Sequence, residues 1–397
     1  MGAEKNIPED WVETTIGNLV ELAQGVAINA KTNHVLSDKE NGLPLLKINN
    51  LLNDTIDQYA NPELVPEKSI IHKNDVIFTR TGQVGKVLIN KYGILHNNSF
   101  KVIPNEKLYW NYLYWYLKSN RVYNYVQKVA AGSVQMDLNH SAFKTIEIKY
   151  PINIDEQKAT AKVLTAFDDK IELLQAQNKT LETMAQTIFK EWFGKYQIGD
   201  ELPEGWRVGD IYNVLDVQYG YPFKSKLFNE NKEGLPLIRI RDIRKGVTGF
   251  YTTESYEEEY IISSGDVLAG MDALFQPYLW SGGKGLLNQR ACRFIPKDFA
   301  SRIFVFEFMK PHLSFYEKTK VGTTVIHLGK GDLDFIETVI PDKESLLKFK
   351  DLTTPIEEKI INNQQEIQSL SKTRDTLLPK LMSGQVRVNN IKQTANA

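Results

Sequence analysis

The sequence predicts an α+β fold: two similar β-rich domains separated by two long helices that pair as an antiparallel coiled coil, with a pseudo-twofold relation between the halves. Three observations support this prediction. A set of motifs occurs twice at a nearly constant spacing, each copy is rich in short alternating runs, and a long heptad pattern follows each copy.

The repeat is the strongest of these signals. GLPLLKI at Gly42–Ile48 recurs 192 residues later as GLPLIRI at Gly234–Ile240, and GILHNNSFKVIP ending at Pro104 recurs as GLLNQRACRFIP ending at Pro296. Six such pairs keep their order, and their offsets drift only from 195 to 190 residues. The two copies are therefore related domains with few insertions.

Strands account for most of each copy. Short runs such as LLKIN, DVIFT, SFKVI and KTIEIKY alternate apolar and polar residues between Gly, Pro and Asn, a pattern typical of strands. One aromatic stretch in the first copy, Leu108–Val129, indicates a helix. Burial of its rings against the sheet is the first interpretation, and a platform for stacking bases is the alternative.

The two long helices are predicted from apolar residues that alternate between positions a and d of a heptad. In the first helix these are Leu164, Phe167, Ile171, Leu174, Leu181, Ala185, Ile188 and Trp192. In the second helix they are Ile356, Ile360, Ile367, Leu370, Leu377 and Leu381. A polar residue interrupts each series at the equivalent place, Asn178 in the first helix and Asn363 in the second.

Those two asparagines predict the register. In an antiparallel pair the numbers of facing residues have a constant sum, and a sum of 541 places Asn178 opposite Asn363. A slip of one heptad would set each amide against an apolar side chain and leave it without a hydrogen-bond partner. The expected domains are residues 1–153, a helix over 154–196, residues 197–342, a helix over 343–384 and a C-terminal tail over 385–397.

Composition sets limits on the function. The formal net charge is -1, so a nucleic-acid partner would require basic residues gathered on one face. A single cysteine, Cys292, excludes a disulfide framework and is expected to be a small buried apolar residue. No stretch approaches 18 apolar residues and no signal peptide opens the sequence, so we expect a cytoplasmic protein with no membrane contact.

The sequence also lacks the usual signatures of catalysis. We find no Asn/Asp-Pro-Pro-Tyr/Phe loop, no phosphate-binding loop and no nucleophile elbow, and the six histidines have no metal-ligand spacing. The sequence therefore predicts a binding protein with no catalytic residue, no metal and no cofactor of its own.

Several motifs resemble one family. LLPKLMSGQVRV at Leu377–Val388 and IFKEWF at Ile188–Phe193 resemble the helix-end motifs of specificity subunits of type I restriction-modification enzymes. The openings PEDW and PEGW and the stretches DVIFTRTGQVGKV and NQRAC fit the same family, and the resemblance covers almost the whole chain.

The resemblance implies a non-catalytic subunit with two target recognition domains, each of which reads half of a split site in double-stranded DNA. It also implies two adenine methyltransferase subunits and, for cleavage, motor–nuclease subunits as partners. S-adenosylmethionine, ATP and magnesium are then expected on those partners only.

Polar residues on strands and loops are the candidate DNA contacts, because such side chains can reach base edges or phosphates. Arg239 and Arg241 are expected on one face of a strand, and Lys47 and Asn49 on the equivalent strand. The other candidates are Arg80, Thr81, Gln83, Asn97, Asn98, Ser133, Gln135, Arg244, Asp272, Gln276, Gln289, Arg290 and Thr323. Simple exposure to water is the alternative for each.

Large apolar residues at the helix ends exceed what a two-helix seam can bury. Packing against their own domains is one interpretation, and a docking face for methyltransferase partners is the other. These residues are Phe189, Trp192, Phe193, Leu378 and Met382.

Two other classes of function stay open at this point: a coiled-coil adaptor whose β-rich domains bind proteins, and an enzyme that acts on DNA alone.

Overall fold

A computed structural model describes residues 8–131, 137–272, 275–319 and 327–388. The chain divides into two compact units. Unit 1 consists of the residues up to 169 and from 371 onward, and unit 2 of residues 170–370. Each unit therefore contains one β-rich copy and a segment of both long helices.

The described residues of unit 1 form three sheets. A two-stranded antiparallel ribbon joins β1 (Trp11–Thr15) to β11 (Glu147–Pro151). A four-stranded sheet has the order β2 (Val20–Gln24), β10 (Ser99–Pro104), β7 (Val76–Thr79) and β8 (Val87–Leu88). A five-stranded sheet has the order β3 (Leu36–Ser37), β5 (Tyr59–Ala60), β4 (Leu43–Leu46), β9 (Gly93–Leu95) and β6 (Ile70–Ile71).

Unit 2 repeats these three sheets strand for strand. Its ribbon joins β12 (Arg207–Asp210) to β22 (Glu337–Ile340). The four-stranded order is β13 (Leu215–Tyr219), β21 (Ala291–Pro296), β18 (Val267–Gly270) and β19 (Pro277–Leu279). The five-stranded order is β14 (Phe228–Asn229), β16 (Tyr251–Thr252), β15 (Leu235–Ile238), β20 (Gly285–Leu287) and β17 (Ile261–Ile262). The predicted duplication is confirmed.

The repeated GLPL motif has a structural reason in both copies. It forms β4 and β15. Each pairs in parallel with β9 or β20 on one side and antiparallel with β5 or β16 on the other. A strand held on both sides buries its apolar side chains, and Leu45 and Leu237 are fully buried.

The expectation that this strand continues through Asn49 and Arg241 is wrong. The strands end at Leu46 and Ile238, and short helices follow at once: α1 (Ile48–Asn53) and α6 (Ile240–Ile243). Ile240 and Ile243 are three residues apart, a helical spacing that a two-residue period cannot accommodate.

The aromatic stretch of the first copy is two helices rather than one. α2 (Trp110–Leu117) ends before Ser119, whose hydroxyl caps α3 (Asn120–Ala130). Tyr112, Trp115 and Tyr116 of α2 are buried in the unit 1 core, so burial is confirmed for these rings, whereas Tyr123 and Tyr125 of α3 are exposed.

Unit 2 contains a counterpart that the sequence analysis did not predict, α7 (Arg302–Thr319). Each unit also has a five-residue helix before its last strand, α4 (His140–Lys144) or α8 (Lys330–Asp334).

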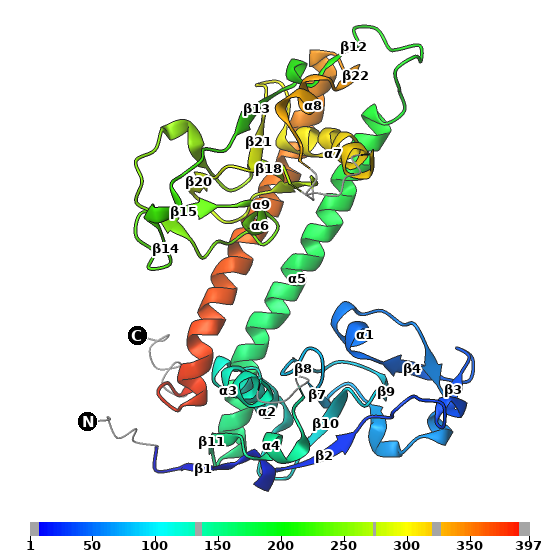
Figure 1. Cartoon of the computed structure of the whole chain (residues 1–397), viewed down its shortest axis with the longest axis vertical. Coiled ribbons are helices and arrows are strands. Elements are labelled where there is room, and N and C mark those ends of the chain that lie inside the picture. The colour runs from blue at the N-terminus through cyan, green and yellow to red at the C-terminus, as the bar shows by residue number, and fades with distance from the viewer. Residues whose placement is uncertain (1–7, 132–136, 273–274, 320–326, 389–397) are drawn as a thin grey trace. The chain divides into compact units, whose positions relative to one another are not determined.

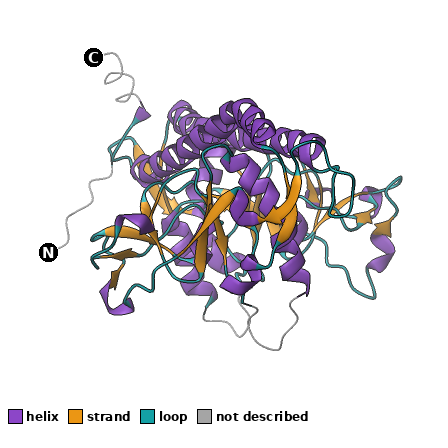
Figure 2. Cartoon of the chain, turned by 90° about the horizontal axis from the view of Figure 1, so that it is seen from above, coloured by secondary structure: helices purple, strands orange, loops and turns teal. Residues whose placement is uncertain are grey.

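The long helices are α5 (Ile154–Phe193) and α9 (Lys343–Met382), which pack together in opposite directions (Figure 1). The Asn363 amide nitrogen donates to the Asn178 amide oxygen at 2.8 Å, so the predicted register is confirmed. Asn178 also donates to the Ile360 carbonyl oxygen at 3.3 Å. Figure 2 shows the long helices in purple and the strands in orange.

The start of α9 explains one of the repeated openings. Asp342 accepts hydrogen bonds from the Ser345 N–H at 3.0 Å and from the Trp206 indole N–H at 2.9 Å. Burial raises the pKa of the Asp342 carboxyl, but the hydrogen bonds from Ser345 and Trp206 outweigh this and hold that pKa below its ordinary value. The tryptophan of LPEGW thus fastens the opening of the second copy to the helix that closes it.

Within the described residues, no helix is long and apolar enough to cross a membrane.

Candidate nucleic-acid interface

In unit 1, three loops that carry predicted DNA contacts meet at one place, which we call junction 1. The backbone N–H groups of Arg80 and Thr81 donate to the Asn98 carbonyl oxygen at 2.9 and 3.3 Å. The Leu138 N–H donates to the Arg80 carbonyl oxygen at 3.0 Å, and Thr81 forms an antiparallel bridge with Asp137. The members of junction 1 are Gln24, Arg80, Thr81, Asn97, Asn98 and Asp137.

The Arg80 guanidinium fixes the side chains of junction 1. Its Nε and Nη2 donate to the two carboxylate oxygens of Asp137 at 3.0 and 2.8 Å, and its Nη1 donates to the Gln24 amide oxygen at 3.3 Å. The Gln24 amide nitrogen in turn donates to the Asn97 carbonyl oxygen at 2.7 Å. Three polar side chains and one backbone carbonyl from distant parts of the sequence are thereby held as one group.

Unit 2 builds the same backbone frame, which we call junction 2. The Met271 N–H donates to the Arg290 carbonyl oxygen at 2.9 Å, and the Leu328 N–H donates to the Met271 carbonyl oxygen at 2.8 Å. Asp272 forms the antiparallel bridge with His327. The members of junction 2 are Met271, Asp272, Gln289, Arg290 and His327.

The side chains of junction 2 differ from those of junction 1. Arg80 is replaced by Met271, Asn98 by Arg290 and Asp137 by His327 in the shared frame. His327 Nδ1 lies 2.8 Å from an Asp272 carboxylate oxygen, and Arg290 Nη1 lies 3.4 Å from the same oxygen. One backbone arrangement therefore presents two different polar surfaces.

Lys47 lies near junction 1, although not on the strand expected. It caps α1, and its ammonium group contacts the Gln58 amide oxygen at 2.5 Å. Burial lowers the pKa of His96, a hydrogen bond with Asn98 raises it, and the positive charge of Lys47 lowers it further. The net result is a pKa of His96 below its ordinary value.

Arg239 requires a correction. It was expected to point outward from a strand, but it caps α6, and its Nε donates to the buried Asp242 carboxylate at 3.0 Å. Its guanidinium carbon lies 3.7 Å from the centre of the Phe250 ring. Its side chain is only 17% exposed, so Arg239 is occupied within its own domain and is a poor candidate for reading a base.

Other candidates lie on the surface outside the two junctions. Asn49, Gln83, Arg241 and Arg244 are exposed, and Gln276 is half-buried and donates to Glu317 at 2.7 Å. Ser133, Gln135 and Thr323 lie outside the described residues.

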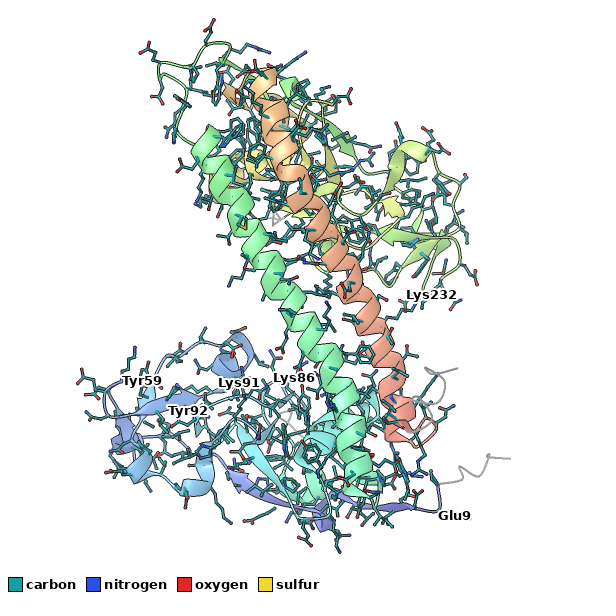
Figure 3. The ribbon with its side chains drawn as sticks, turned by 180° about the vertical axis from the view of Figure 1, so that it is seen from behind. Glu9, Tyr59, Lys86, Lys91, Tyr92 and Lys232 are labelled. Carbon is teal, nitrogen blue, oxygen red and sulfur yellow. The ribbon has the colours of Figure 1, made fainter. Side chains whose placement is uncertain are left out.

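A cation that the sequence analysis missed follows the Gln83 loop. Lys86, labelled in Figure 3, is exposed. Its ammonium nitrogen lies 5.6 Å from the centre of the Tyr123 ring. Gln24, Asp137 and His327 were also missed, although the offset of 190 residues between Asp137 and His327 matches that of the repeat. Aligning the copies residue by residue would have found that pair.

The apolar residues at the end of α5 pack into unit 2. Phe193 is buried, with its ring 5.1 Å from that of Phe349 and 5.2 Å from that of Phe304. Phe189 and Trp192 are half-buried against the same cluster. This matches packing within the chain rather than an exposed docking face.

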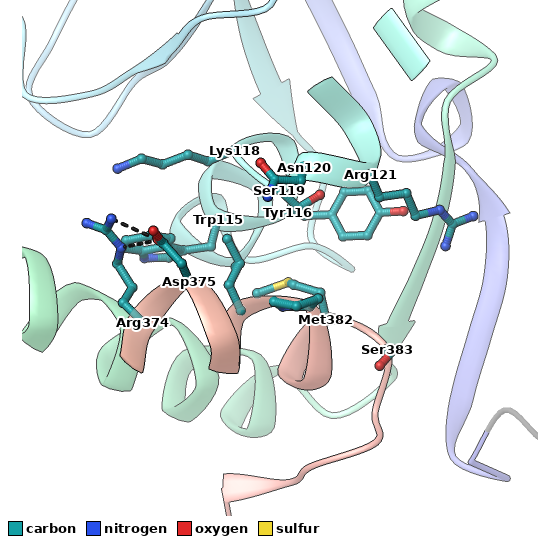
Figure 4. A pocket seen from close by; sticks show the side chains of 12 residues that line it. Trp115, Tyr116, Lys118, Ser119, Asn120, Arg121, Arg374, Asp375, Met382 and Ser383 are labelled. Atoms are coloured by element: carbon teal, nitrogen blue, oxygen red, sulfur yellow. Dashed lines mark hydrogen bonds and ion pairs between the residues drawn. The ribbon is translucent and has the colours of Figure 1, made fainter. Parts of the chain in front are cut away.

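Leu378 and Met382 at the end of α9 are likewise buried in the unit 1 core. They line a pocket of about 210 Å³ together with Trp115 of α2, and the Arg374–Asp375 pair lies at its edge (Figure 4). The docking-face interpretation is not supported for these two residues, because α2 and α3 already cover them.

No group of three or more metal-ligating side chains occurs among the described residues. Cys292 is confirmed as a small buried residue, and burial raises the pKa of its thiol to about 12, so the sulfur is not a nucleophile at neutral pH.

Comparison with known proteins identifies the family. Residues 8–183 and 203–371 both match the type I restriction modification DNA specificity domain. The chain belongs to this family. Its members confer specificity and do not catalyse, so the chain is not an enzyme.

Individual relatives agree with that assignment. The chain is 28% identical to the type I restriction enzyme MjaIX specificity subunit of Methanocaldococcus jannaschii, over 97% of this chain and 95% of that one. It is 31% identical to the EcoBI specificity subunit of Escherichia coli, over 48% of this chain and 36% of that one. The crystal structure of a type I S subunit from M. genitalium shares the fold, with a TM-score of 0.60 at 16% identity over 96% of this chain and 98% of that one.

Proposed function

We propose that this chain is the subunit that recognises a bipartite DNA target, with one half-site read at junction 1 and the other at junction 2. The observation that supports the proposal is the shared backbone frame of the two junctions, which carries different polar side chains in each. Two domains that recognise different half-sites on one scaffold require such a division. The backbone frame fixes the position relative to DNA, and the side chains select the bases.

The proposal includes the partners. The chain directs two adenine methyltransferase subunits and, for cleavage, motor–nuclease subunits to the target. S-adenosylmethionine, ATP and magnesium belong to those subunits. The family assignment supports this division of labour, because the chain contributes specificity and its partners contribute chemistry.

Sequencing of methylated bases in cells with and without the gene tests the proposal. A split adenine motif should appear with the gene and vanish without it. Asn97→Ala, at junction 1, should relax the motif in one half, and Gln289→Ala, at the equivalent place in junction 2, should relax it in the other half. Arg207→Lys, an exposed change on β12 outside both junctions, is the matched control and should leave the motif intact.

Three results would contradict the proposal: an unsplit motif, relaxation of the same half by both variants, or methylation or cleavage of DNA by the isolated chain.

A further inference from the structure

The two arginines of the junctions differ in which edge of the guanidinium is already used. Arg80 donates from Nε and Nη2 to both oxygens of Asp137, and its side chain is 23% exposed. Nε and Nη2 form the side edge of the guanidinium, whose two parallel donors match a pair of acceptors. At Arg80 a carboxylate of the same domain occupies this edge, so Arg80 holds junction 1 together.

Arg290 leaves that edge open. Only its Nη1 has partners, the Asp272 carboxylate oxygen at 3.4 Å and His327 Nδ1 at 3.3 Å. In the part of the chain that the structure describes, Nε and Nη2 of Arg290 have no hydrogen-bond partner, and the side chain is 56% exposed. Arg290 stands in the place of Asn98 rather than of Arg80, and the place of Asp137 is taken by His327, which cannot accept from both donors at once.

The backbone of Arg290 provides a second, independent observation. Its φ angle is +69°, in the left-handed region that residues other than glycine seldom adopt. Its counterpart Asn98 is not in that region, although asparagine tolerates it better than arginine does. The Met271 N–H donates to the Arg290 carbonyl oxygen at 2.9 Å in this conformation. Strain of this kind persists where the surrounding structure enforces it, and it gathers at functional sites.

We propose that Arg290 is the guanine-reading residue of the second recognition domain. Its Nε and Nη2 donate to O6 and N7 of one guanine, the acceptor pair that a guanine presents in the major groove. Asp272 is a positioning residue that accepts from Nη1 and so orients the open edge, and His327 Nδ1 contacts the same Asp272 oxygen. This inference rests on the proposed function and deepens it, because it assigns one base to one residue of one half-site.

The test uses the complete methyltransferase complex and a DNA library with both half-sites randomised, read out as the methylated fraction of each sequence. Arg290→Lys is the decisive variant. Lysine keeps the positive charge but loses the paired donors. Discrimination at one G·C pair of the second half-site should fall roughly 5- to 150-fold, while the first half-site is read as before. Arg207→Lys is the matched control, with no expected change.

The same library tests the positioning role. Asp272→Asn removes the charge that orients Arg290, so discrimination should weaken at that same base pair and nowhere else. A merely structural role would instead lower methylation of all sequences alike. Arg80→Lys should act differently from Arg290→Lys, because its side edge is bound to Asp137. It should weaken recognition across the first half-site and leave the second half-site read as before.

A specificity profile that Arg290→Lys leaves unchanged, with Arg290→Ala weakening all sequences equally, would overturn the proposal and make Arg290 a phosphate contact. The proposed function and the assignment of guanine to Arg290 can be rejected separately. Absence of a split motif in the wild-type complex would reject the proposed function, whereas a split motif that Arg290→Lys leaves intact would reject only the assignment of guanine to Arg290.

Discussion

Two polar residues buried in the helix pair determine its register. Asn178 and Asn363 are 6% and 1% exposed, and their amides bond to each other within unit 2. An amide pair cannot be matched by an apolar neighbour, so these two residues select one register from several that the apolar heptads would allow.

Replacement of one asparagine should cost more than replacement of both. Asn363→Leu leaves the Asn178 oxygen buried without its donor, and we expect a loss of about 1–3 kcal/mol in the free energy of unfolding. The double variant Asn178→Leu/Asn363→Leu removes both polar groups and should recover most of that loss. Denaturant unfolding of the full chain measures both effects, read from the transition that belongs to unit 2.

Asn362→Leu is the matched control, because Asn362 is the exposed neighbour on the same helix and should change stability little. Additive losses in the double variant would show that the two amides do not act as a pair.

At the scale of elements, the stretch after α9 is part of unit 1. Arg387 donates from Nε to Glu156 at 2.9 Å and from Nη1 to Asp10 at 3.1 Å, while Val388 is buried in the core. The end motif of the chain therefore ties the region before β1 to the first turn of α5. Residues 385–388, assigned to a tail from the sequence, are fixed in this way.

Arg387→Met should weaken the contact of the chain end with the region before β1 and with the first turn of α5. The Glu156 side chain is only 8% exposed, so loss of its cation leaves a buried carboxylate without compensation. We expect a loss of roughly 1.5–3 kcal/mol in the stability of unit 1 and a lower melting temperature. Addition of Glu156→Gln should restore part of it, because the uncompensated charge is then gone.

Lys380→Met, an exposed change on the last turn of α9, is the control for loss of a cation. Equal melting temperatures for Arg387→Met and Lys380→Met would contradict the assigned role of Arg387.

Elements were predictable where one period runs over many residues. The heptads and the repeat predicted α5, α9 and the duplication, because each of those signals extends over dozens of positions. The turn from β4 into α1 was missed, since the first turn of a six-residue helix offers only Ile48 and Leu51 as periodic residues. The counterpart helix α7 was missed because Pro311 lies inside it.

The candidate site was predictable only in part. The loops of Arg80, Asn98 and Arg290 were identified from polarity, but their side-chain partners come from distant parts of the sequence. Asp137 is 57 residues from Arg80, and His327 is 37 residues from Arg290. No local pattern encodes such contacts; the fold brings them together.

At the scale of the whole molecule, the two units share one backbone arrangement and differ in the polar side chains that their junctions present. Arg80 with Asp137 and Gln24 forms a closed group, whereas Arg290 with Asp272 and His327 leaves two donors open. Duplication followed by change at a few such positions alters the side chains of one half without disturbing the sheets or the helix pair of either.

The helix pair allows a test of the bipartite proposal. The boundary between the units crosses α5 after Asp169 and α9 after Leu370. In the confirmed register, in which facing numbers add to 541, these two points face each other to within one residue. One heptad inserted at each point therefore preserves every pairing within unit 1 and within unit 2.

Seven helical residues add about 10.5 Å, which corresponds to roughly three base pairs of DNA. Three base pairs also turn the DNA by about a third of its helical repeat, whereas a heptad returns a coiled coil nearly to the same face. We therefore expect the one-heptad variant to require a spacer about three base pairs longer and to bind more weakly.

Three heptads add about 31.5 Å, close to one DNA turn of ~34 Å, so that variant should regain affinity at a spacer roughly nine to ten base pairs longer. Methylation of a library with variable spacers measures both, and a heptad inserted into α5 alone, which mismatches the helices, is the control that should impair assembly. An unchanged spacer in both paired variants would mean that the length of the helices does not set the distance between the half-sites.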